Sequence, residues 1–258
     1  LEHFLTDTAD FADYVLPATT QLEHRDLHGT YGHTYLVAND PAIAPVGQAK
    51  PNTQIFRELA AALGLSDPCF AEDDETLARQ ALKGIDFEAL RANGFVSLPL
   101  PEAPFAEGGF LTPSGKAWAD HPEQGVPDFV ANHEALETAP ALAARFPLAM
   151  ISPPARNFLN SSFVNVKSLR DIEREPLLEM HPDDATPRGL DAGAMARVFN
   201  ARGEQRLRVV LNGRARPGVV NGLGVWWRKF GVDGKNVNEL THQRLTDLGG
   251  GPTFYDCL

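Results

Sequence analysis

A polar loop at residues 156–162 contains the side chains of this sequence that are best suited to bind a ligand. Arg156, Asn160, Ser161 and Ser162 follow an apolar run at 146–152. A guanidinium can hold a phosphate through two parallel hydrogen bonds, while amides and hydroxyls both donate and accept. The loop therefore indicates recognition of a polar ligand, and a polar turn with an ordinary surface arginine is an equally good interpretation.

Two other groups of residues could suggest catalysis or metal binding. Asp183 and Asp184 are adjacent and could form a general acid and base pair, but two acids at a helix start are more simply a helix cap and a first-turn charge. Three histidines could share a metal ion, yet intervening glycines interrupt any helix that would align them. We interpret these as loop histidines: His24, His28 and His33.

The stretch 181–211 shows most clearly which elements would position a binding loop. A short helical turn is expected to stop at Gly189, and a tight turn at 190–193 leads into a strand at 194–199. A second turn joins that strand to another at 207–211. Short strands at this spacing favour a small barrel or sandwich over a parallel α/β sheet.

The N-terminal half shows mainly helical periodicity. Helices are expected at 53–63, at 73–83 and from 87 onward. Gly64 is the expected stop of the first helix. A short strand at 14–16 should end at Pro17, because proline cannot donate to a β-ladder. The acidic, proline-rich run at 120–128 indicates a linker.

The composition limits the class of protein. The 258 residues, 43% of them hydrophobic, suffice for one large or two smaller globular domains. The net charge of -11 argues against a general nucleic-acid or anionic-membrane surface. Two distant cysteines, Cys69 and Cys257, imply neither a disulfide framework nor a metal site made by this chain alone. No apolar run approaches the ~20 residues that span a bilayer.

Four arginines near one another could form a local basic patch, although an exposed hairpin face explains them better than an anion site. They are Arg206, Arg208, Arg214 and Arg216. The chain begins with Leu rather than Met and ends within an apparent strand. We therefore expect a fragment that lacks targeting information, with a cytoplasmic location expected and a periplasmic one left open.

The N-terminal residues carry a resemblance to a known family. Residues 6–18, TDTADFADYVLPA, followed by Glu23, resemble the T-x-T-A-x-x-A-D-x-V-L-P-A segment of the molybdopterin oxidoreductase family, the dimethyl sulfoxide reductase and formate dehydrogenase group. Residues 110–116, FLTPSGK, are similar to the family's F-x-T-P-S-G-K-x-E segment, although the following Ala117-Trp118 departs from it.

The C-terminal half resembles the same family. Residues 182–203 match its P-x-D-A-x-x-x-G-x-x-x-G-x-x-V-x-V-x-N-x-x-G pattern, with Ala194-Met195-Ala196-Arg197 in place of the more usual Asp-x-Val start. Residues 216–220, RPGVV, are similar to its P-G-V strand entry. The resemblance implies three parts. Residues 1–66 would end an α/β domain with a parallel sheet, 67–145 would be a helical or irregular connection, and 146–258 would be an all-β six-stranded double-psi barrel that binds molybdopterin dinucleotide.

The resemblance also implies a cofactor, bis(molybdopterin guanine dinucleotide) carrying Mo or W, and two-electron oxygen-atom or hydride-equivalent transfer. The metal ligand and a [4Fe–4S] cluster would belong to upstream domains outside this chain, so we expect no catalytic and no metal-binding residue here. The expected partners are the pterin cofactor, those upstream domains and an electron-transfer subunit, with no nucleic acid and no membrane span.

The expected cofactor contacts follow from the resemblance as well. In the family, an Arg and a Ser-bearing loop after the first strand of the C-terminal domain contact the pterin, and a W-W, N-x-L-T and P-x-Y-like series lines the pocket. The expected contacts are Arg156, Asn160, Ser161, Ser162, Trp227, Asn238, Thr241, Thr253, Phe254 and Tyr255. Paired tryptophans can also be core, which is the expected place of at least one of them.

A second interpretation belongs to a different class. The barrel could be a non-catalytic module that binds a cofactor or a subunit in a respiratory complex that has lost the metal. Upstream sequence would separate the two interpretations, because only an enzyme needs the metal-ligating residue.

Overall fold

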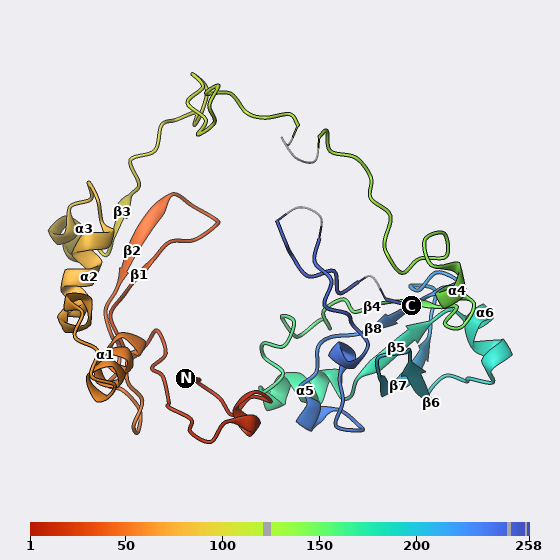
Figure 1. Cartoon of the computed structure of the whole chain (residues 1–258). Coiled ribbons are helices and arrows are strands. Elements are labelled where there is room, and N and C mark those ends of the chain that lie inside the picture. The colour runs from red at the N-terminus through yellow and green to blue at the C-terminus, as the bar shows by residue number, and fades with distance from the viewer. Residues whose placement is uncertain (121–124, 247–248, 256) are drawn as a thin grey trace. The chain divides into compact units, whose positions relative to one another are not determined.

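A computed structural model describes residues 1–120, 125–246, 249–255 and 257–258 (Figure 1). The chain falls into two compact units, at 1–127 and 128–258, and each is described by itself. Residues 67–127 thus group with the N-terminal residues, and 128–145 group with the C-terminal ones. Among the described residues, no helix is long and apolar enough to cross a membrane.

The first unit combines short helices with a small sheet. Its elements are η1 (Ala9–Phe11), β1 (Asp26–His28), β2 (Tyr35–Asn39), α1 (Asn52–Ala62), η2 (Pro68–Ala71), α2 (Asp74–Ala81), α3 (Phe87–Asn93) and β3 (Phe95–Ser97). The sheet order is β1-β2-β3, and both pairs are antiparallel.

Local chemistry explains the helices of this unit. The Asp73 side chain caps α2 by accepting from the Thr76 N–H at 2.7 Å. Asp86 caps α3, which ends at Gly94 in the left-handed conformation with φ 76°. Gly64 follows α1 with φ 71°. The helices predicted at 53–63 and 73–83 are confirmed within about two residues at each end.

The predicted parallel sheet at 1–66 is wrong for the strands that the structure describes there. β1 and β2 are joined by the short segment 29–34, which allows an antiparallel hairpin, whereas a parallel pair needs a crossover of roughly a dozen residues or more. The strand predicted at 14–16 does not form either. Parallel pairing in this region is limited to isolated bridges, Glu2 with Pro17 and Ala18 with Lys50.

Glu23, the acid that follows the family-like block, is a structural acceptor. It is 7% exposed and accepts from the Thr20 N–H at 2.7 Å and from the Val46 N–H at 2.6 Å. These bonds connect the end of the N-terminal block to the segment before α1. Of the three histidines, His28 lies in β1 rather than in a loop.

The second unit is built on a curved mixed sheet. Its elements are α4 (Pro140–Ala143), β4 (Ala149–Ile151), α5 (Lys167–Glu173), β5 (Leu177–Met180), α6 (Pro182–Ala185), η3 (Thr186–Arg188), β6 (Met195–Phe199), β7 (Glu204–Leu211), β8 (Val219–Gly222), η4 (Arg228–Phe230) and η5 (Val237–Glu239). The strand order is β4-β8-β5-β7-β6. The pairs β4/β8 and β5/β7 are parallel, while β5/β8 and β6/β7 are antiparallel.

The pattern predicted for 181–211 is confirmed. The helical turn ends at Gly189, whose φ is 64°, and β6 and β7 form an antiparallel hairpin closed by the Asn200 N–H donating to the Gly203 carbonyl at 3.0 Å. One detail differs. His181 is the cap of α6, because its ring nitrogen accepts from the Asp183 N–H, so the two adjacent acids lie in the first turn instead.

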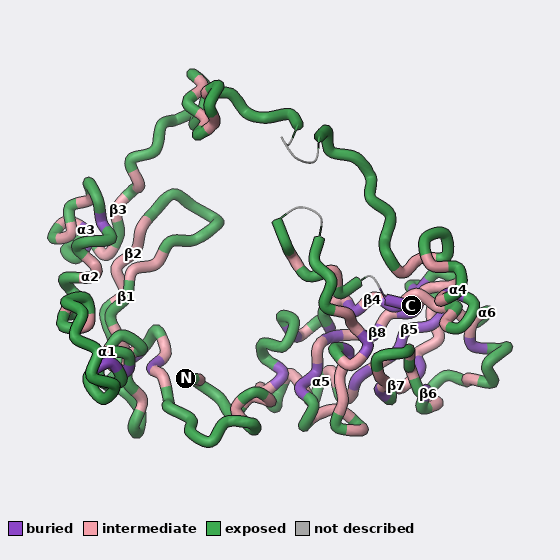
Figure 2. The backbone as a smooth tube through the Cα atoms, in the orientation of Figure 1, coloured by how far each residue is buried: buried purple, intermediate pink, exposed green. Residues whose placement is uncertain are grey.

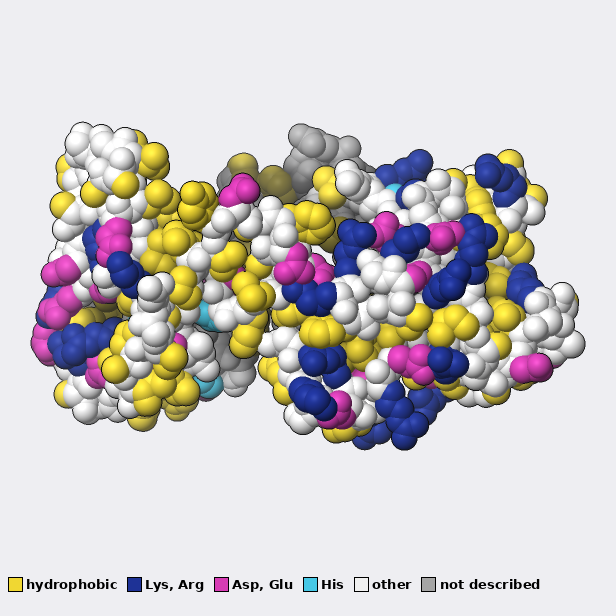
Figure 3. Space-filling view, turned by 90° about the horizontal axis from the view of Figure 1, so that it is seen from below, with side chains coloured by type: hydrophobic (Ala, Val, Ile, Leu, Met, Phe, Trp, Pro, Cys, Tyr) yellow, Lys and Arg dark blue, Asp and Glu magenta, His cyan; other side chains and the backbone are white. Residues whose placement is uncertain are grey.

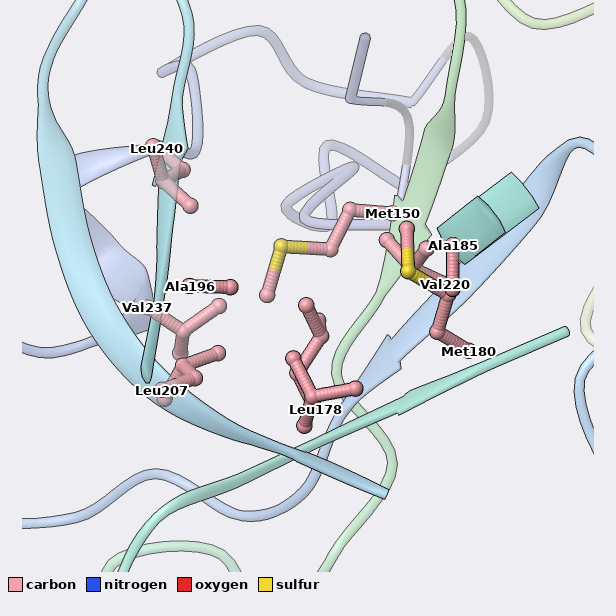
Figure 4. Close-up of a cluster of buried hydrophobic side chains, with 10 residues drawn as sticks. Met150, Leu178, Met180, Ala185, Ala196, Leu207, Val220, Val237 and Leu240 are labelled. Carbon is pink, nitrogen blue, oxygen red and sulfur yellow. The ribbon is translucent and has the colours of Figure 1, made fainter. Parts of the chain in front are cut away.

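The sheet holds the main core on its concave side. Side chains from β4 to β8 and from η5 converge there, and Figure 4 shows Met150 pointing between Ala196 and Leu178. The buried members are Met150, Leu178, Met180, Ala185, Ala196, Leu207, Val209, Val220, Val237 and Leu240. Figure 2 shows the buried segments gathered on these strands. The architecture is a half-barrel of five described strands.

Candidate cofactor-binding loops

The loop that follows β4 ends in a tight, exposed turn. Leu159 and Ser162 exchange two backbone hydrogen bonds, at 3.2 and 2.8 Å, so Asn160 and Ser161 form the tip. Asn160 has φ 52°, a left-handed conformation that asparagine tolerates better than most residues. The sequence pattern Asn-Ser-Ser therefore builds a small hairpin that presents its side chains to solvent.

Buried aromatic side chains pack against this loop and hold it in place. Phe158 is 5% exposed and packs edge-on against Trp226, with ring centroids 5.0 Å apart. Trp227 donates its indole N–H to the Ser161 carbonyl at 2.8 Å. Both tryptophans belong to a second buried cluster with Ala155 and Val164. A buried indole N–H needs an acceptor, and the tip of the loop provides it.

The base of the loop also requires a close approach. Gly224 has φ 80°, and a Cβ added there would lie 3.1 Å from the Ala155 Cβ. Its N–H donates to the Pro153 carbonyl at 2.8 Å. Gly224 therefore fixes where the loop leaves the sheet, and any larger residue would displace it.

A carboxylate on α5 anchors the middle of the loop. The Glu173 Oε1 accepts from both the backbone N–H and the side-chain Nδ2 of Asn157, each at 2.7 Å. Asn157 is adjacent to Arg156 in the chain. The sequence interpretation missed Glu173, although an acid at the C-terminal end of a helix, where the helix dipole disfavours it, is a local signal of another role.

The polar side chains predicted to contact the cofactor point into solvent. Arg156, Asn160, Ser161 and Ser162 are all exposed, and their side chains make no hydrogen bond or ion pair with the described part of the chain. Their guanidinium, amide and hydroxyl groups are thus available to an outside ligand. Backbone hydrogen bonds and the buried Phe158 ring hold the loop in place. The donor groups of its exposed side chains make no hydrogen bond with the described part of the chain.

A second loop is tied to the same tryptophan pair. The Asn236 side chain accepts from the Asn238 N–H at 3.1 Å, which caps η5, and donates to the Trp226 carbonyl at 3.0 Å. Asn238 itself is exposed, and Thr241 donates its hydroxyl to the Asn238 carbonyl at 3.3 Å. Two of the predicted contacts, Asn238 and Thr241, are thereby linked to the first loop through Trp226.

The third group of predicted contacts lies near the C-terminus. The Thr253 hydroxyl donates to the Arg244 carbonyl at 3.1 Å and lies 3.4 Å from the His242 Nδ1. Phe254 and Tyr255 are both nearly half exposed, and their ring centroids are 4.5 Å apart. Thr253 thus lies beside His242, which follows Thr241 of the second loop.

Trp227 is buried in the protein interior. It is 9% exposed and stacks on Phe230 with ring centroids 5.9 Å apart. Trp226 is 4% exposed. The prediction that at least one tryptophan belongs to the core is confirmed for both. The observed contact of Trp227 with the loop is through the Ser161 carbonyl.

Charge is divided unevenly between the two units. Residues 1–127 contain 7 Lys and Arg against 19 Asp and Glu, whereas residues 128–258 contain 16 against 15. Figure 3 shows many basic side chains on one face of the second unit. Of the four arginines noted in the sequence, Arg208 pairs with Glu175 and Arg214 with Glu179.

The described His, Cys, Asp and Glu residues form no group of three or more that could hold a metal ion.

Family models match both ends of this chain. The molydopterin dinucleotide binding domain matches residues 148–258, and the molybdopterin oxidoreductase model matches residues 1–62. The first match contains all the loops described above. The second contains the N-terminal block that ends at Glu23.

Known proteins agree with these matches. A probable oxidoreductase of Bacillus subtilis is 37% identical and covers 98% of this chain and 38% of its own length. The dimethyl sulfoxide/trimethylamine N-oxide reductase of Rhodobacter capsulatus is 31% identical, with 83% of this chain and 30% of the relative covered. The solved structure of acetylene hydratase from Pelobacter acetylenicus superposes with a TM-score of 0.71 at 25% identity, covering 85% of this chain and 32% of that chain.

This chain spans about a third of the length of these relatives. The same relatives carry the names of several reactions, so the family does not define a substrate. The matches at both ends, together with the half-barrel and its loops, support one assignment. The chain belongs to the molybdopterin oxidoreductase family, in the dimethyl sulfoxide reductase group, and corresponds to a C-terminal portion of such a protein.

Proposed function

We propose that this chain forms part of the cofactor site of a molybdenum or tungsten oxidoreductase and binds bis(molybdopterin guanine dinucleotide). The loop after β4 supports this proposal most directly. Arg156 and the Asn160–Ser162 turn have exposed side chains that make no hydrogen bond with the described part of the chain, and the two tryptophans hold the backbone of the loop in place. A polyanionic dinucleotide with many ring donors and acceptors requires such groups.

The residues present fit that cofactor in their chemistry. Arg156 would bind a phosphate or a ring carbonyl, while Asn160, Ser161, Ser162 and Asn238 would bind ring edges or ribose hydroxyls. Thr241, Thr253, Phe254 and Tyr255 would complete the contacts from the C-terminal side. Trp227 would act through the Ser161 carbonyl that it holds.

The cofactor, when bound, supplies the two-electron chemistry of oxygen-atom or hydride-equivalent transfer. The residues of this chain would bind and orient it. The metal ligand, a [4Fe–4S] cluster and the contacts of an electron-transfer subunit would come from other regions of the protein or from its partners. The named reactions of the relatives favour an enzyme over a non-catalytic module that has lost the metal.

We further propose that the half-barrel belongs to a six-stranded double-psi barrel at 146–258. The Met150 N–H donates to the Cys257 carbonyl at 3.0 Å, and the Asn200 Nδ2 donates to the Leu258 carbonyl at 3.1 Å. Residues 257–258 thus contact β4 and Asn200, the residue that follows β6. β4 and β6 are the two edge strands of the described sheet. A largely apolar cavity of about 220 Å³ lies there, and these residues would take the position of the sixth strand. The family's domains would then divide the chain at 66 and 145.

Direct measurement of the cofactor tests the proposal. The intact protein would be produced in a host that makes the molybdenum cofactor, with and without tungstate in the medium. Pterin would be measured by fluorescence after oxidation, GMP by its release in acid, and Mo and W by mass spectrometry. We expect two pterins and two GMP for each metal atom. Recovery of protein with neither pterin nor metal would overturn the oxidoreductase proposal.

A further inference from the structure

Glu173 connects α5 to the loop that carries Arg156. Its Oε1 accepts from the backbone N–H and from the Nδ2 of Asn157, each at 2.7 Å, across 16 residues of sequence. Both bonds therefore converge on one carboxylate oxygen. Because the two donors belong to the same residue, the pair fixes both the position and the orientation of Asn157.

This carboxylate is poorly placed for the stability of its own helix. Glu173 is the last residue of α5, where the helix dipole disfavours a negative charge. Arg170, the basic residue of that last turn, donates to the Val164 carbonyl at 2.7 Å. Helix propensity and capping thus do not account for an acid at this position.

The backbone after Glu173 is strained as well. Arg174 has φ 70° and ψ -70°, and the Glu175 N–H donates to the Glu173 carbonyl at 2.9 Å. This is a γ-turn of the rare kind, which is costly for a residue other than glycine. The γ-turn ends α5 at Glu173, whose carboxylate lies beside Asn157.

We infer that Glu173 is a positioning residue of the cofactor site. It holds Asn157 so that the neighbouring Arg156 and the Asn160–Ser162 turn are already arranged before the cofactor binds. A loop that is ordered in advance binds more tightly, because less conformational entropy is lost on binding. The inference rests on the proposed function, since it assigns Glu173 to the same site.

Three variants of the intact protein separate positioning from other roles. Glu173→Ala removes both bonds, whereas Glu173→Gln keeps an oxygen that can accept both of them. Asn157→Ala removes only the side-chain bond and tests the same contact from the loop. Asp171→Ala is the matched control, because Asp171 lies on α5 but pairs with Lys167 at 2.6 Å.

The readouts are the pterin and GMP content of each purified variant, the rate of cofactor loss in mild urea, and the melting temperature. We expect Glu173→Ala to lose cofactor about tenfold faster, as for loss of hydrogen bonds to a charged group. Asn157→Ala should lose it about threefold faster. Glu173→Gln and Asp171→Ala should stay close to the wild type.

The outcomes distinguish this inference from the proposed function. A wild-type protein without pterin would overturn both. The wild type could instead contain the cofactor while Glu173→Ala and Asn157→Ala lose it no faster than the wild type does. That result would overturn only the positioning role. Equal losses in Glu173→Ala and Glu173→Gln, with melting temperatures lowered in parallel, would show a general requirement for the charge and would also overturn it.

Discussion

Trp227 donates its indole N–H to the backbone carbonyl of Ser161 at 2.8 Å, although the two residues are 66 positions apart. The acceptor is a main-chain atom, so the Ser161 hydroxyl remains available at the tip of the loop. The bond ties that tip to the aromatic cluster beneath it. A loop with uncommitted side chains can thereby have a fixed backbone, which is what a preformed binding site needs.

Trp227→Phe tests this contact. Phenylalanine can keep the stacking on Phe230 but leaves the Ser161 carbonyl without its donor. We expect the free energy of unfolding to fall by about 1 kcal/mol and the pterin content of the intact protein to fall with it. Urea unfolding and pterin fluorescence measure the two effects. Trp118→Phe, at a tryptophan of the first unit that is 51% exposed, is the control and should change neither.

Substitutions at Asn160 separate backbone conformation from ligand contact. Glycine adopts φ 52° without strain, so Asn160→Gly should keep the melting temperature while it lowers cofactor affinity about tenfold through the lost amide. Asn160→Ala should lower both, because a left-handed alanine costs roughly 1–2 kcal/mol. If Asn160→Gly bound the cofactor as tightly as the wild type does, Asn160 would not be a cofactor contact.

Local sequence signals predicted the elements at 181–211 well. The two turns that precede β6 contain Gly189 and Gly193, whose φ values of 64° and 83° glycine adopts easily. Such signals act over a few residues, so they can be read from a single sequence. The same holds for the exposed turn at Asn160, where polar residue types predicted a solvent-facing loop.

The contacts that the sequence did not predict are those between distant residues. No sequence pattern near Glu173 indicates that Asn157 is its hydrogen-bond partner, and no pattern near Trp227 indicates Ser161. The pairing of β3 with β2 is another such contact, because the two strands are more than fifty residues apart in the chain.

Helical periodicity has a related limit. It predicted the helix α1, in which Ile55 and Ala60 are buried, yet Phe56 and the following Leu63 are 53% and 66% exposed. Periodicity identifies an apolar face but does not show what covers it.

Gly203 brings the β6–β7 hairpin against η5, which carries Asn238. A Cβ at Gly203 would lie 2.7 Å from the Glu239 carbonyl oxygen, a backbone atom that cannot move by a simple rotamer change. We expect Gly203→Ala to destabilise the protein by about 1–3 kcal/mol and to weaken cofactor binding by displacing Asn238. The matched control is Gly213→Ala, where a Cβ would meet no atom within 4 Å. Equal denaturation midpoints for the two variants would contradict this account.

Glu134 and Arg202 predict how the stability of the second unit depends on pH. The Glu134 carboxylate accepts two hydrogen bonds from the Arg202 guanidinium, at 2.6 and 2.9 Å, and one from the Leu258 N–H at 3.2 Å. Burial raises the pKa of Glu134, but the bonds from Arg202 and Leu258 lower it by more, so the pKa in the folded protein lies below its ordinary value of 4.5.

A carboxyl whose pKa is lowered by folding stabilises the protein fully above its unfolded pKa, and this stabilisation is lost as the pH falls through the folded pKa. Glu134→Gln should therefore lower the free energy of unfolding at neutral pH by about 1.5 kcal/mol or more, and the difference from wild type should shrink as the pH falls below the ordinary value for glutamate. Urea unfolding across this pH range measures the difference. Glu137→Gln, three residues along the same segment, controls for loss of a charge. A constant difference at every pH would show that the ionised Glu134 carboxylate does not hold the C-terminal residues through this contact.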